Sequence, residues 1–363
     1  MTATTTGPSL RRLVEERSIL VCCGSGGVGK TTTAAVLALE AARAGRRAVV
    51  VTIDPAKRLA DALGLEGLTG TPSQIDGDWP GELWALMLDT KSTFDDLVVA
   101  HASTPEQGQR ILANRFYRNI SGALSGTQEY MAMEKLYELH QRSDFDVVVV
   151  DTPPTRNALD FIDAPRRLSR FLDHRLFRMI TAPGRGMMKA VNVAAQTFLR
   201  TVAKVVGAEV IDDAVAFFQA FEGMEQGFRE RADAVFHLLS DADTAFVLVA
   251  SPRRDTIDEA RYFAAKLAEA GITVRALIVN RMHPTFGDGL AEAARARAAT
   301  LEGTDLGGLY RNLADFQLVA SREEHHLSGL AEAVSPAPVV RVPFLPTDVH
   351  DIGGLTEVAR YLR

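Results

Sequence analysis

The sequence predicts an α/β protein, with a doubly wound, mostly parallel sheet and an inserted α-helical subdomain. Three observations support this class. Short apolar runs of strand length end in polar loops, helical patterns stand between several of these runs, and two long stretches show a helical pattern alone. The runs are apolar throughout, as expected for strands that helices cover on both faces. The predicted strands are Ile19–Cys23, Ala48–Ile53, Phe145–Val150, Ala245–Ala250, Ala276–Val279 and Val339–Val342.

Helices fit between several of these strands. After Lys30 the stretch TTTAAVLALEAARAG ends at Gly45, and glycine is a favourable helix stop. The stretch DTIDEARYFAAKLAEAG opens with a predicted Asp255/Thr256 cap and stops at Gly271. Its predicted buried face holds Ile257, Ala260, Phe263, Ala264 and Leu267. Near the C-terminus, GLTEVARYLR places Leu355, Val358 and Leu362 on one side, and we expect that side to pack on the core.

The same patterns suggest a domain organisation. We expect a flexible tail over 1–14 and an α/β core over 15–92, 143–157 and 236–363. The helical stretches 93–142 and 158–235 flank the third strand, so they are expected to pack together as one subdomain. The second of them is rich in Met and basic. The overlapping range from Pro153 to Lys204 holds ten Lys or Arg residues against three Asp or Glu residues.

The composition excludes several function classes. The chain has 363 residues, of which 47% are hydrophobic and 24% charged, as in ordinary soluble proteins. A formal net charge of -6 argues against nucleic-acid binding by the whole protein. The longest apolar runs are strand-sized, and the N-terminal MTATTTGPSLRRLVEER lacks the apolar segment of a secretory signal. We therefore expect a cytoplasmic protein that binds no nucleic acid.

The cysteine content is consistent with a reduced, cytoplasmic compartment. Cys22 and Cys23 are the only two, and as neighbours in a strand they point to opposite faces of the sheet. The chain has no CxxC pair, so no zinc site is expected. Two thiols also fall short of the trio that would hold arsenite.

A glycine-rich loop follows the first strand in the run ILVCCGSGGVGKTTTAA. Residues 24–31 match the pattern G-x-x-x-x-G-K-[ST] of a P-loop, also called Walker A, between a strand and a helix. Glycines let the backbone N–H groups turn inward around phosphate oxygens. We expect Lys30 to bridge the β- and γ-phosphates, Thr31 to bind Mg²⁺ and Thr32 to reach the α-phosphate. The other expected nucleotide contacts in the loop are Gly26, Gly27, Val28 and Gly29. The sequence thus predicts a P-loop NTPase that uses ATP and Mg²⁺.

Three polar residues follow other predicted strands. Asp151 ends the FDVVVVD strand, which is the usual position of a carboxylate that holds Mg²⁺ through water. Asp54 ends the second strand and could orient the attacking water, or it could be a helix cap. Asn280, at the tip of ALIVN, could hydrogen-bond an adenine, or it could be a turn residue.

These motifs together resemble the arsenical-pump ATPase (ArsA) family, which includes the eukaryotic ATPase that targets tail-anchored membrane proteins. The matching stretches, in the family's order and spacing, are GGVGKTT at 26–32, DPAKRLADALG at 54–64, DTPPT at 151–155, IVNRM at 278–282 and VPFLP at 342–346. The resemblance covers the chain from about residue 18 to its end. It implies a nucleotide-driven dimer with Asp54 in the first switch and Asp151 in the second. It also implies nucleotide contacts at Pro343 and Phe344, and an apolar groove in the helical subdomain.

The sequence departs from the family's pattern at several positions. The family's loop normally reads G-K-G-G-V-G-K-T, and its first lysine reaches across the dimer to the partner's phosphates; here Ser25 occupies that position. Pro153, Arg156 and Asn157 alter the second switch, and Lys57 stands where eukaryotic members often have His. The departure at Ser25 predicts slow turnover and suggests either a homodimer without this lysine or a heterodimer with a lysine-bearing paralogue.

Several functions remain open at this stage. A nucleotide-binding regulatory subunit without significant hydrolysis would keep the loop, and a ParA/MinD-type positioning ATPase would share it but lack the long helical insertions. A kinase of small molecules would need a second polar constellation, which the sequence does not show. The basic, Met-rich helices at 165–206 could be an ordinary packed face, a groove for an apolar helix of a membrane-protein client, or a peripheral contact with anionic lipid.

Overall fold

A computed structural model of the chain describes residues 9–54, 57–120, 127–152, 208–287 and 289–362. The chain divides into two compact units, which are described separately below. The first unit comprises Met1–Met87, Leu139–Leu159 and Ser240–Arg363, and the second comprises Leu88–Glu138 and Asp160–Leu239. The expected helical insertions at 93–142 and 158–235 overlap the second unit.

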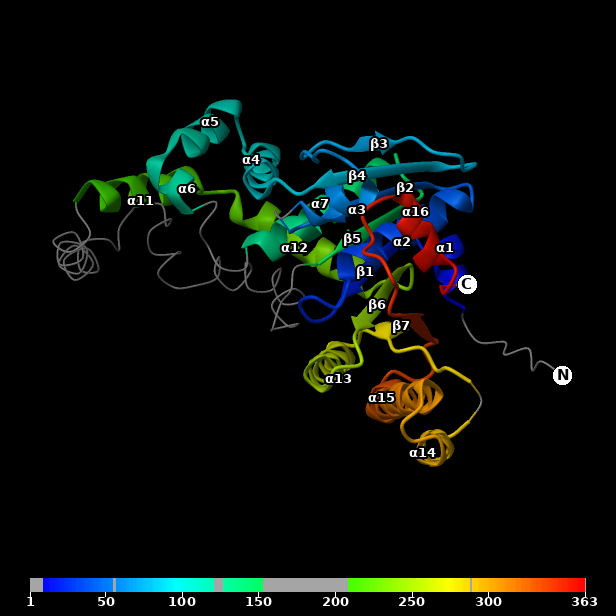
Figure 1. Ribbon diagram of the computed structural model, residues 1–363. Helices are drawn as coiled ribbons and strands as arrows, with labels where there is room; N and C mark the ends of the chain where they lie inside the picture. The colour runs from blue at the N-terminus through cyan, green and yellow to red at the C-terminus, as the bar shows by residue number, and fades with distance from the viewer. Residues whose placement is uncertain (1–8, 55–56, 121–126, 153–207, 288, 363) are drawn as a thin grey trace. The chain divides into compact units, whose positions relative to one another are not determined.

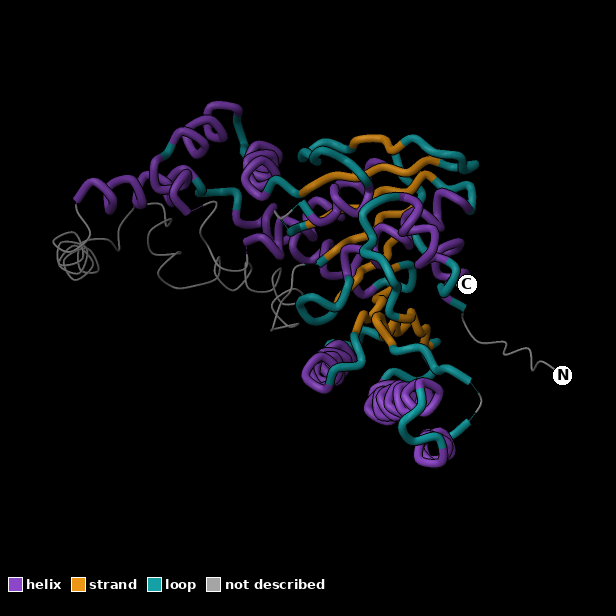
Figure 2. Tube along the Cα trace, viewed as in Figure 1, coloured by secondary structure: helices purple, strands orange, loops and turns teal. Residues whose placement is uncertain are grey.

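The first unit is built on a sheet of eight strands in the order β3-β4-β2-β5-β1-β6-β7-β8 (Figures 1 and 2). All neighbouring strands are parallel except β3, which runs antiparallel to β4. The strands are β1 (Ile19–Cys23), β2 (Arg47–Thr52), β3 (Ser73–Ile75), β4 (Glu82–Met87), β5 (Val147–Asp151), β6 (Thr244–Ala250), β7 (Val274–Met282) and β8 (Val339–Pro343). The predicted fold class, α/β with a mostly parallel sheet, is confirmed.

Two of these strands, β3 and β4, were not predicted from the sequence. β3 has only three residues, and β4 alternates between half-buried side chains such as Glu82 and Trp84 and buried ones such as Leu83. A strand near the edge of a sheet is covered incompletely, so it needs no continuous apolar run. This edge of the sheet therefore carries no continuous apolar run that would predict it from the sequence.

Helices cover both faces of the sheet. The helices of the first unit are α1 (Leu10–Glu16), α2 (Lys30–Arg43), α3 (Arg58–Leu63), α13 (Arg254–Glu269), α14 (Ala291–Thr300), α15 (Asp305–Ala333) and α16 (Ile352–Ala359). Leu20 and Cys22 join a core cluster with α2, whereas Ile19 and Val21 point the other way and are equally buried. Near the C-terminus, Leu355, Val358 and Leu362 are buried in the same cluster as α2, which confirms their predicted packing.

The helix predictions are confirmed in part. α2 ends at Arg43, with Gly45 just beyond it at a φ of 86°. All five residues of the predicted face of α13 are buried. The predicted Asp255/Thr256 cap of α13 is wrong, because the cap position is Arg253 and no side chain caps the helix there. The Thr256 hydroxyl instead donates to the carbonyl of Ser251, and Asp255 pairs with Arg253.

The N-terminal helix α1 lies partly within the stretch 1–14 that was expected to be a flexible tail. Ser9 caps the helix by accepting a hydrogen bond from the backbone N–H of Arg12, and Leu10, Leu13 and Val14 are buried. Apolar residues at positions i, i+3 and i+4 form one face of a helix, which explains why residues 10–14 pack.

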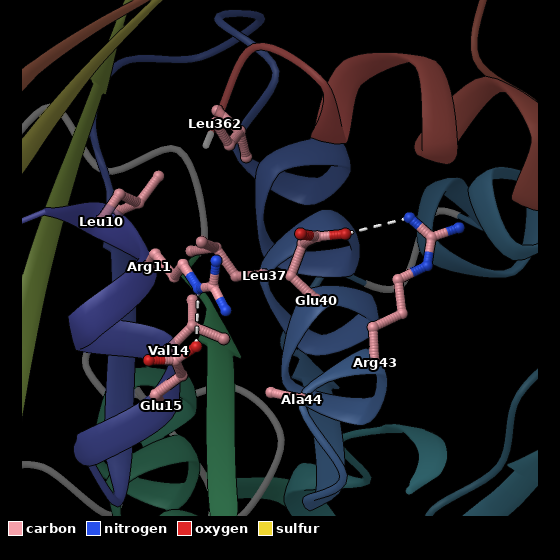
Figure 3. Close-up of a pocket in the computed structure, with 9 residues that line it drawn as sticks. All are labelled: Leu10, Arg11, Val14, Glu15, Leu37, Glu40, Arg43, Ala44 and Leu362. Atoms are coloured by element: carbon pink, nitrogen blue, oxygen red, sulfur yellow. Dashed lines mark hydrogen bonds and ion pairs between the residues drawn. The ribbon is translucent and has the colours of Figure 1, made fainter. Parts of the chain in front are cut away.

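A small cavity separates α1 from α2 (Figure 3). Its volume is about 250 Å³, and Leu10 and Val14 of α1, Leu37 of α2 and Leu362 line it. Two ion pairs within single helices, Arg11 with Glu15 and Arg43 with Glu40, stand at its rim.

The second unit is helical throughout the part that the structure describes. It contains α4 (Thr90–His101), α5 (Pro105–Ala113), α6 (Arg115–Ile120), α11 (Ala208–Ala220) and most of α7 (Thr127–Arg142) and α12 (Glu225–Ser240). Aromatic rings fill its interior, among them Tyr117, Phe217 and Phe228. The basic, Met-rich stretch 165–206 lies outside the described residues. Among the helices that are described, none is long and apolar enough to cross a membrane.

Candidate nucleotide site

The loop between β1 and α2 has a backbone that only glycine allows at two points. Gly24 and Gly29 have φ values of 144° and 95°. A Cβ on Gly24 would lie 2.0 Å from the carbonyl oxygen of Val249, and one on Gly29 would lie 2.2 Å from Nδ2 of Asn280. The loop therefore packs tightly against β6 and β7 on one side. Gly26 and Gly27 are exposed on the other side, where their backbone is accessible to a ligand.

Lys30 is the first residue of α2, and its side chain is buried. The Nζ atom donates a hydrogen bond to the backbone carbonyl of Ser25 at 2.8 Å, so the lysine folds back over its own loop. Burial lowers the pKa of Lys30, while the nearby Asp151 opposes that shift. The ammonium is thus bonded to one neutral carbonyl, and the charge of Asp151 nearby favours its protonated form.

Asp151 occupies the centre of the site, because β5 lies between β1 and β2. The strand register places it beside Cys22 on one side and Thr52 on the other. Its Oδ2 atom accepts hydrogen bonds from the hydroxyls of Thr31 at 2.7 Å and Thr52 at 2.9 Å. Burial raises the pKa of Asp151 to about 6, although the two hydroxyls and Lys30 oppose the shift.

This arrangement fits a hard divalent cation. The Thr31 hydroxyl donates its hydrogen bond to Asp151, so its oxygen lone pairs are available to a metal. The Oδ1 atom of Asp151 is buried and has no hydrogen-bond partner among the described residues. Mg²⁺ prefers oxygen ligands, commonly one or two carboxylates together with water and phosphate oxygens. The residues predicted to hold Mg²⁺, Thr31 and Asp151, are therefore brought together.

The sequence analysis did not identify Thr52, which holds the same carboxylate oxygen as Thr31. The available signal was its place in the strand that ends at Asp54. A residue two positions before a strand-end carboxylate points to the same face of the sheet.

Asp54 follows β2 and lies at the same edge of the sheet. Its Oδ2 atom pairs with Nη1 of Arg58 at 3.1 Å, and its backbone N–H donates to the Thr52 hydroxyl at 3.3 Å. The Asp54 charge is close enough to raise the pKa of Asp151. The structure thus places Asp54 beside the predicted metal ligands, in salt-bridge contact with an arginine.

A second cavity, of about 240 Å³, adjoins the start of α2. Gly29, Thr32, Asn280, Pro343 and Phe344 help to line it, so it brings together five of the predicted nucleotide contacts. The Phe344 side chain is 59% exposed, which leaves an aromatic face available to a planar base.

The amide of Asn280 is engaged with the loop. Its Nδ2 atom donates to the carbonyl of Val28 at 3.0 Å, and its Oδ1 atom accepts from the backbone N–H of Arg281 at 2.9 Å. Arg281 itself has a left-handed backbone, with a φ of 63°, and its Nη1 atom donates to the carbonyl of Gly27 at 3.1 Å. Sequence reasoning missed this arginine, because no local pattern predicts a left-handed arginine.

Ser25, the residue that departs from the family's loop, is buried. Its Oγ atom has no hydrogen-bond partner within the described part of the chain. Its backbone carbonyl accepts the hydrogen bond from Nζ of Lys30. The departures at Pro153, Arg156 and Asn157 lie outside the described residues, as does the stretch 153–155 of the predicted second switch. The remaining departure, Lys57, is described and exposed, and its Nζ atom donates to the carbonyl of Glu66 at 3.3 Å.

Comparison with known proteins identifies the family. A family model described as "Anion-transporting ATPase" matches residues 17–300. The chain is 27% identical to ATPase GET3 of Malassezia globosa over 295 residues, which cover 80% of this chain and 81% of the relative. It is 26% identical to ATPase ARSA2 of Chlamydomonas reinhardtii over 287 residues, which cover 78% of this chain and 73% of the relative. With a glycine loop, a buried lysine and a threonine–aspartate pair at the same sheet edge, the chain belongs to the anion-transporting ATPase family and is an ATPase.

Proposed function

We propose that the chain is a Mg²⁺-dependent, slowly hydrolysing ATPase that works as a nucleotide-gated dimeric switch. One observation carries the first part of this proposal. Asp151 holds the hydroxyls of Thr31 and Thr52 on one oxygen, while its other oxygen is buried without a partner among the described residues. A carboxylate in that state matches a site that completes its coordination with a cation.

Each residue of the site then has a stated role. The exposed loop amides and Lys30 stabilise negative charge on the phosphates, and Asp54 orients the attacking water. Thr31 and Asp151 would hold Mg²⁺, which would neutralise charge on the phosphate oxygens. Pro343, Phe344 and Asn280 enclose the base, and Thr32 contacts the α-phosphate.

Slow turnover and the choice of partner follow from Ser25. A short hydroxyl side chain cannot place a positive charge in the site of a second subunit, and one such charge is worth several kcal/mol, or about 10³-fold or more in rate, in related phosphoryl-transfer sites. A homodimer of this chain would lack that charge in both sites. A heterodimer with a lysine-bearing paralogue would supply it to this subunit's site, so we favour the heterodimer.

The client is proposed from the family resemblance. An ATP-gated groove in the helical unit would bind an apolar helix, such as that of a membrane protein, in the cytoplasm. Contact of the basic helices with anionic lipid is the alternative for the same segment. If the chain with ATP binds anionic lipid vesicles and does not bind an apolar helical peptide, lipid contact is favoured.

Steady-state hydrolysis tests the proposal about turnover. The isolated chain should hydrolyse ATP slowly, and a lysine-bearing paralogue or the variant Ser25→Lys should raise the rate by about tenfold or more. Ser25→Ala is the matched control and should leave the rate unchanged. Hydrolysis by the isolated chain that is as fast as hydrolysis with the paralogue would contradict the proposal of slow turnover.

Two further variants separate hydrolysis from mere binding. Lys30→Ala should abolish ATP binding, whereas Asp54→Asn should retain binding and lose hydrolysis by about 10²-fold or more. If a client assay responds to Lys30→Ala and not to Asp54→Asn, the chain uses nucleotide structurally, as a regulatory subunit would.

A further inference from the structure

We propose that Arg281 is a nucleotide-binding residue whose guanidinium contacts the phosphates of the bound nucleotide. It would give this subunit a cation of its own beside a loop in which Ser25 replaces a lysine. The inference rests on the proposed binding of Mg²⁺-ATP at this loop.

The position of Arg281 is fixed by a clamp on the loop. Two adjacent residues at the end of β7 donate hydrogen bonds to two adjacent loop carbonyls. Asn280 donates to the carbonyl of Val28 at 3.0 Å, and Arg281 donates to the carbonyl of Gly27 at 3.1 Å. The Asn280 side chain also accepts the backbone N–H of Arg281, which links the two contacts. The guanidinium is therefore held directly at the phosphate loop.

The backbone at Arg281 indicates that this placement is specific. A φ of 63° is uncommon for a residue with a Cβ, and such strain persists only where the surrounding structure imposes it. An observed outlier of this kind is a reason to look for function. The left-handed turn here directs the side chain back over the loop instead of along the strand.

Lys30 provides a direct parallel within the same loop. Its ammonium donates to the carbonyl of Ser25, and the guanidinium of Arg281 donates to the carbonyl of Gly27, two residues further on. Both cations thus bond to neutral loop carbonyls. Phosphate is a stronger acceptor for a cation than a neutral carbonyl, because the hydrogen bond is then charged on both sides.

The exposure of Arg281 and its place in the cavity allow its guanidinium to bind a phosphate. Arg281 is exposed, and it lines the cavity of about 240 Å³ together with Gly29 and Thr32 at the loop end. A guanidinium has five N–H donors, so it can bind a phosphate and still reach Gly27. Asp348 also lines this cavity and would repel phosphate, so the phosphates are expected on the side of Arg281 and the loop.

A nucleotide series tests the inference. The purified full chain, with Mg²⁺, is titrated calorimetrically with adenosine, AMP, ADP and ATP. Arg281→Ala should weaken ATP and ADP binding by about tenfold or more and adenosine binding by less than about twofold. Arg281→Lys should recover part of the loss. Arg275→Ala, in the same strand and outside the loop and cavity, is the matched control and should change nothing.

Arg281→Gln separates the charge from the loop contact, since its amide can donate a hydrogen bond but carries no charge. It should lose ATP affinity as Arg281→Ala does. Unchanged ATP affinity in Arg281→Gln, or an equal loss for adenosine and ATP, would overturn the inference. A wild-type chain that binds no ATP would instead defeat the proposed function. ATP binding that depends on Lys30 and not on Arg281 would defeat the inference alone.

Discussion

Asp151 is a buried carboxylate whose environment favours its neutral form. Its pKa is raised to about 6 from an ordinary value near 3.8, so stability falls as the pH rises from about 4 to about 6, and the full cost of the ionised group is present above that pH. Since each pKa unit corresponds to about 1.4 kcal/mol, the cost at neutral pH is about 1–3 kcal/mol without a bound cation. This cost falls on the residue that we propose as a ligand of Mg²⁺.

The variant Asp151→Asn should therefore gain stability as it loses activity. We expect its free energy of unfolding, without Mg²⁺ and nucleotide, to rise by about 1 kcal/mol, because the amide carries no charge and its oxygen still accepts the two threonine hydroxyls. ATP hydrolysis should fall by about 10²-fold or more. Urea denaturation at neutral pH measures the first effect, and a loss of stability would contradict the electrostatic account.

At the residue scale, the predictable part of the site is the local part. Lys30 and Thr31 belong to one contiguous motif, and Asp151 ends a strand with a continuous apolar run, so their place at one site could be predicted from spacing. Thr52 and Arg281 were missed for a different reason. Thr52 reaches the site through the register of two strands that are distant in sequence, and Arg281 reaches the loop from a backbone conformation that its residue type disfavours.

At the element scale, α1 shows what the pattern search passed over. The helix has only seven residues, but Ser9 caps it and its apolar face is buried. The sequence signal was present as a capping serine followed by three apolar residues at helical spacing. A short amphipathic helix gains its stability from packing and not from its own propensity, so this weak signal does not by itself distinguish the helix from a flexible tail.

Truncation of the α1 face should destabilise the first unit. Leu13 is 3% exposed, and Leu13→Ala should lower the free energy of unfolding by about 2–3 kcal/mol, through lost burial and the cavity left behind. Glu16→Ala, at an exposed position of the same helix, is the control and should change stability by less than about 0.5 kcal/mol. Urea unfolding followed by circular dichroism gives both values. Equal stability of the two variants would show that α1 contributes nothing to the core.

At the scale of the whole molecule, the site is assembled from distant parts of the chain. Thr31 and Thr52 come before the first helical insertion, Asp151 stands between the two insertions, and Asn280 follows both. Nucleotide binding therefore requires the complete first unit and should stabilise it as a whole. A ligand that binds only the folded state raises stability with its concentration.

Mg²⁺-ATP should accordingly raise the melting temperature of the protein. At a ligand concentration of about 100 times Kd, the gain in unfolding free energy is about 2.7 kcal/mol. Removal of Mg²⁺ with EDTA should reduce the shift, and Thr31→Val should abolish the part that depends on Mg²⁺. Thr31→Ser keeps the hydroxyl and should restore that part. A shift in Thr31→Val that still responds to Mg²⁺ would place the cation elsewhere.

The two cysteines give the molecule one further property. They are consecutive residues of the central strand β1, with exposures of 0% for Cys22 and 2% for Cys23. Burial raises the pKa of both thiols. Towards thiol reagents the folded protein should behave as if it had no cysteine. A fluorescent probe can thus be attached to a single introduced surface cysteine without removing the native pair. Any slow labelling of the native pair would then time the opening of the sheet directly behind the phosphate loop.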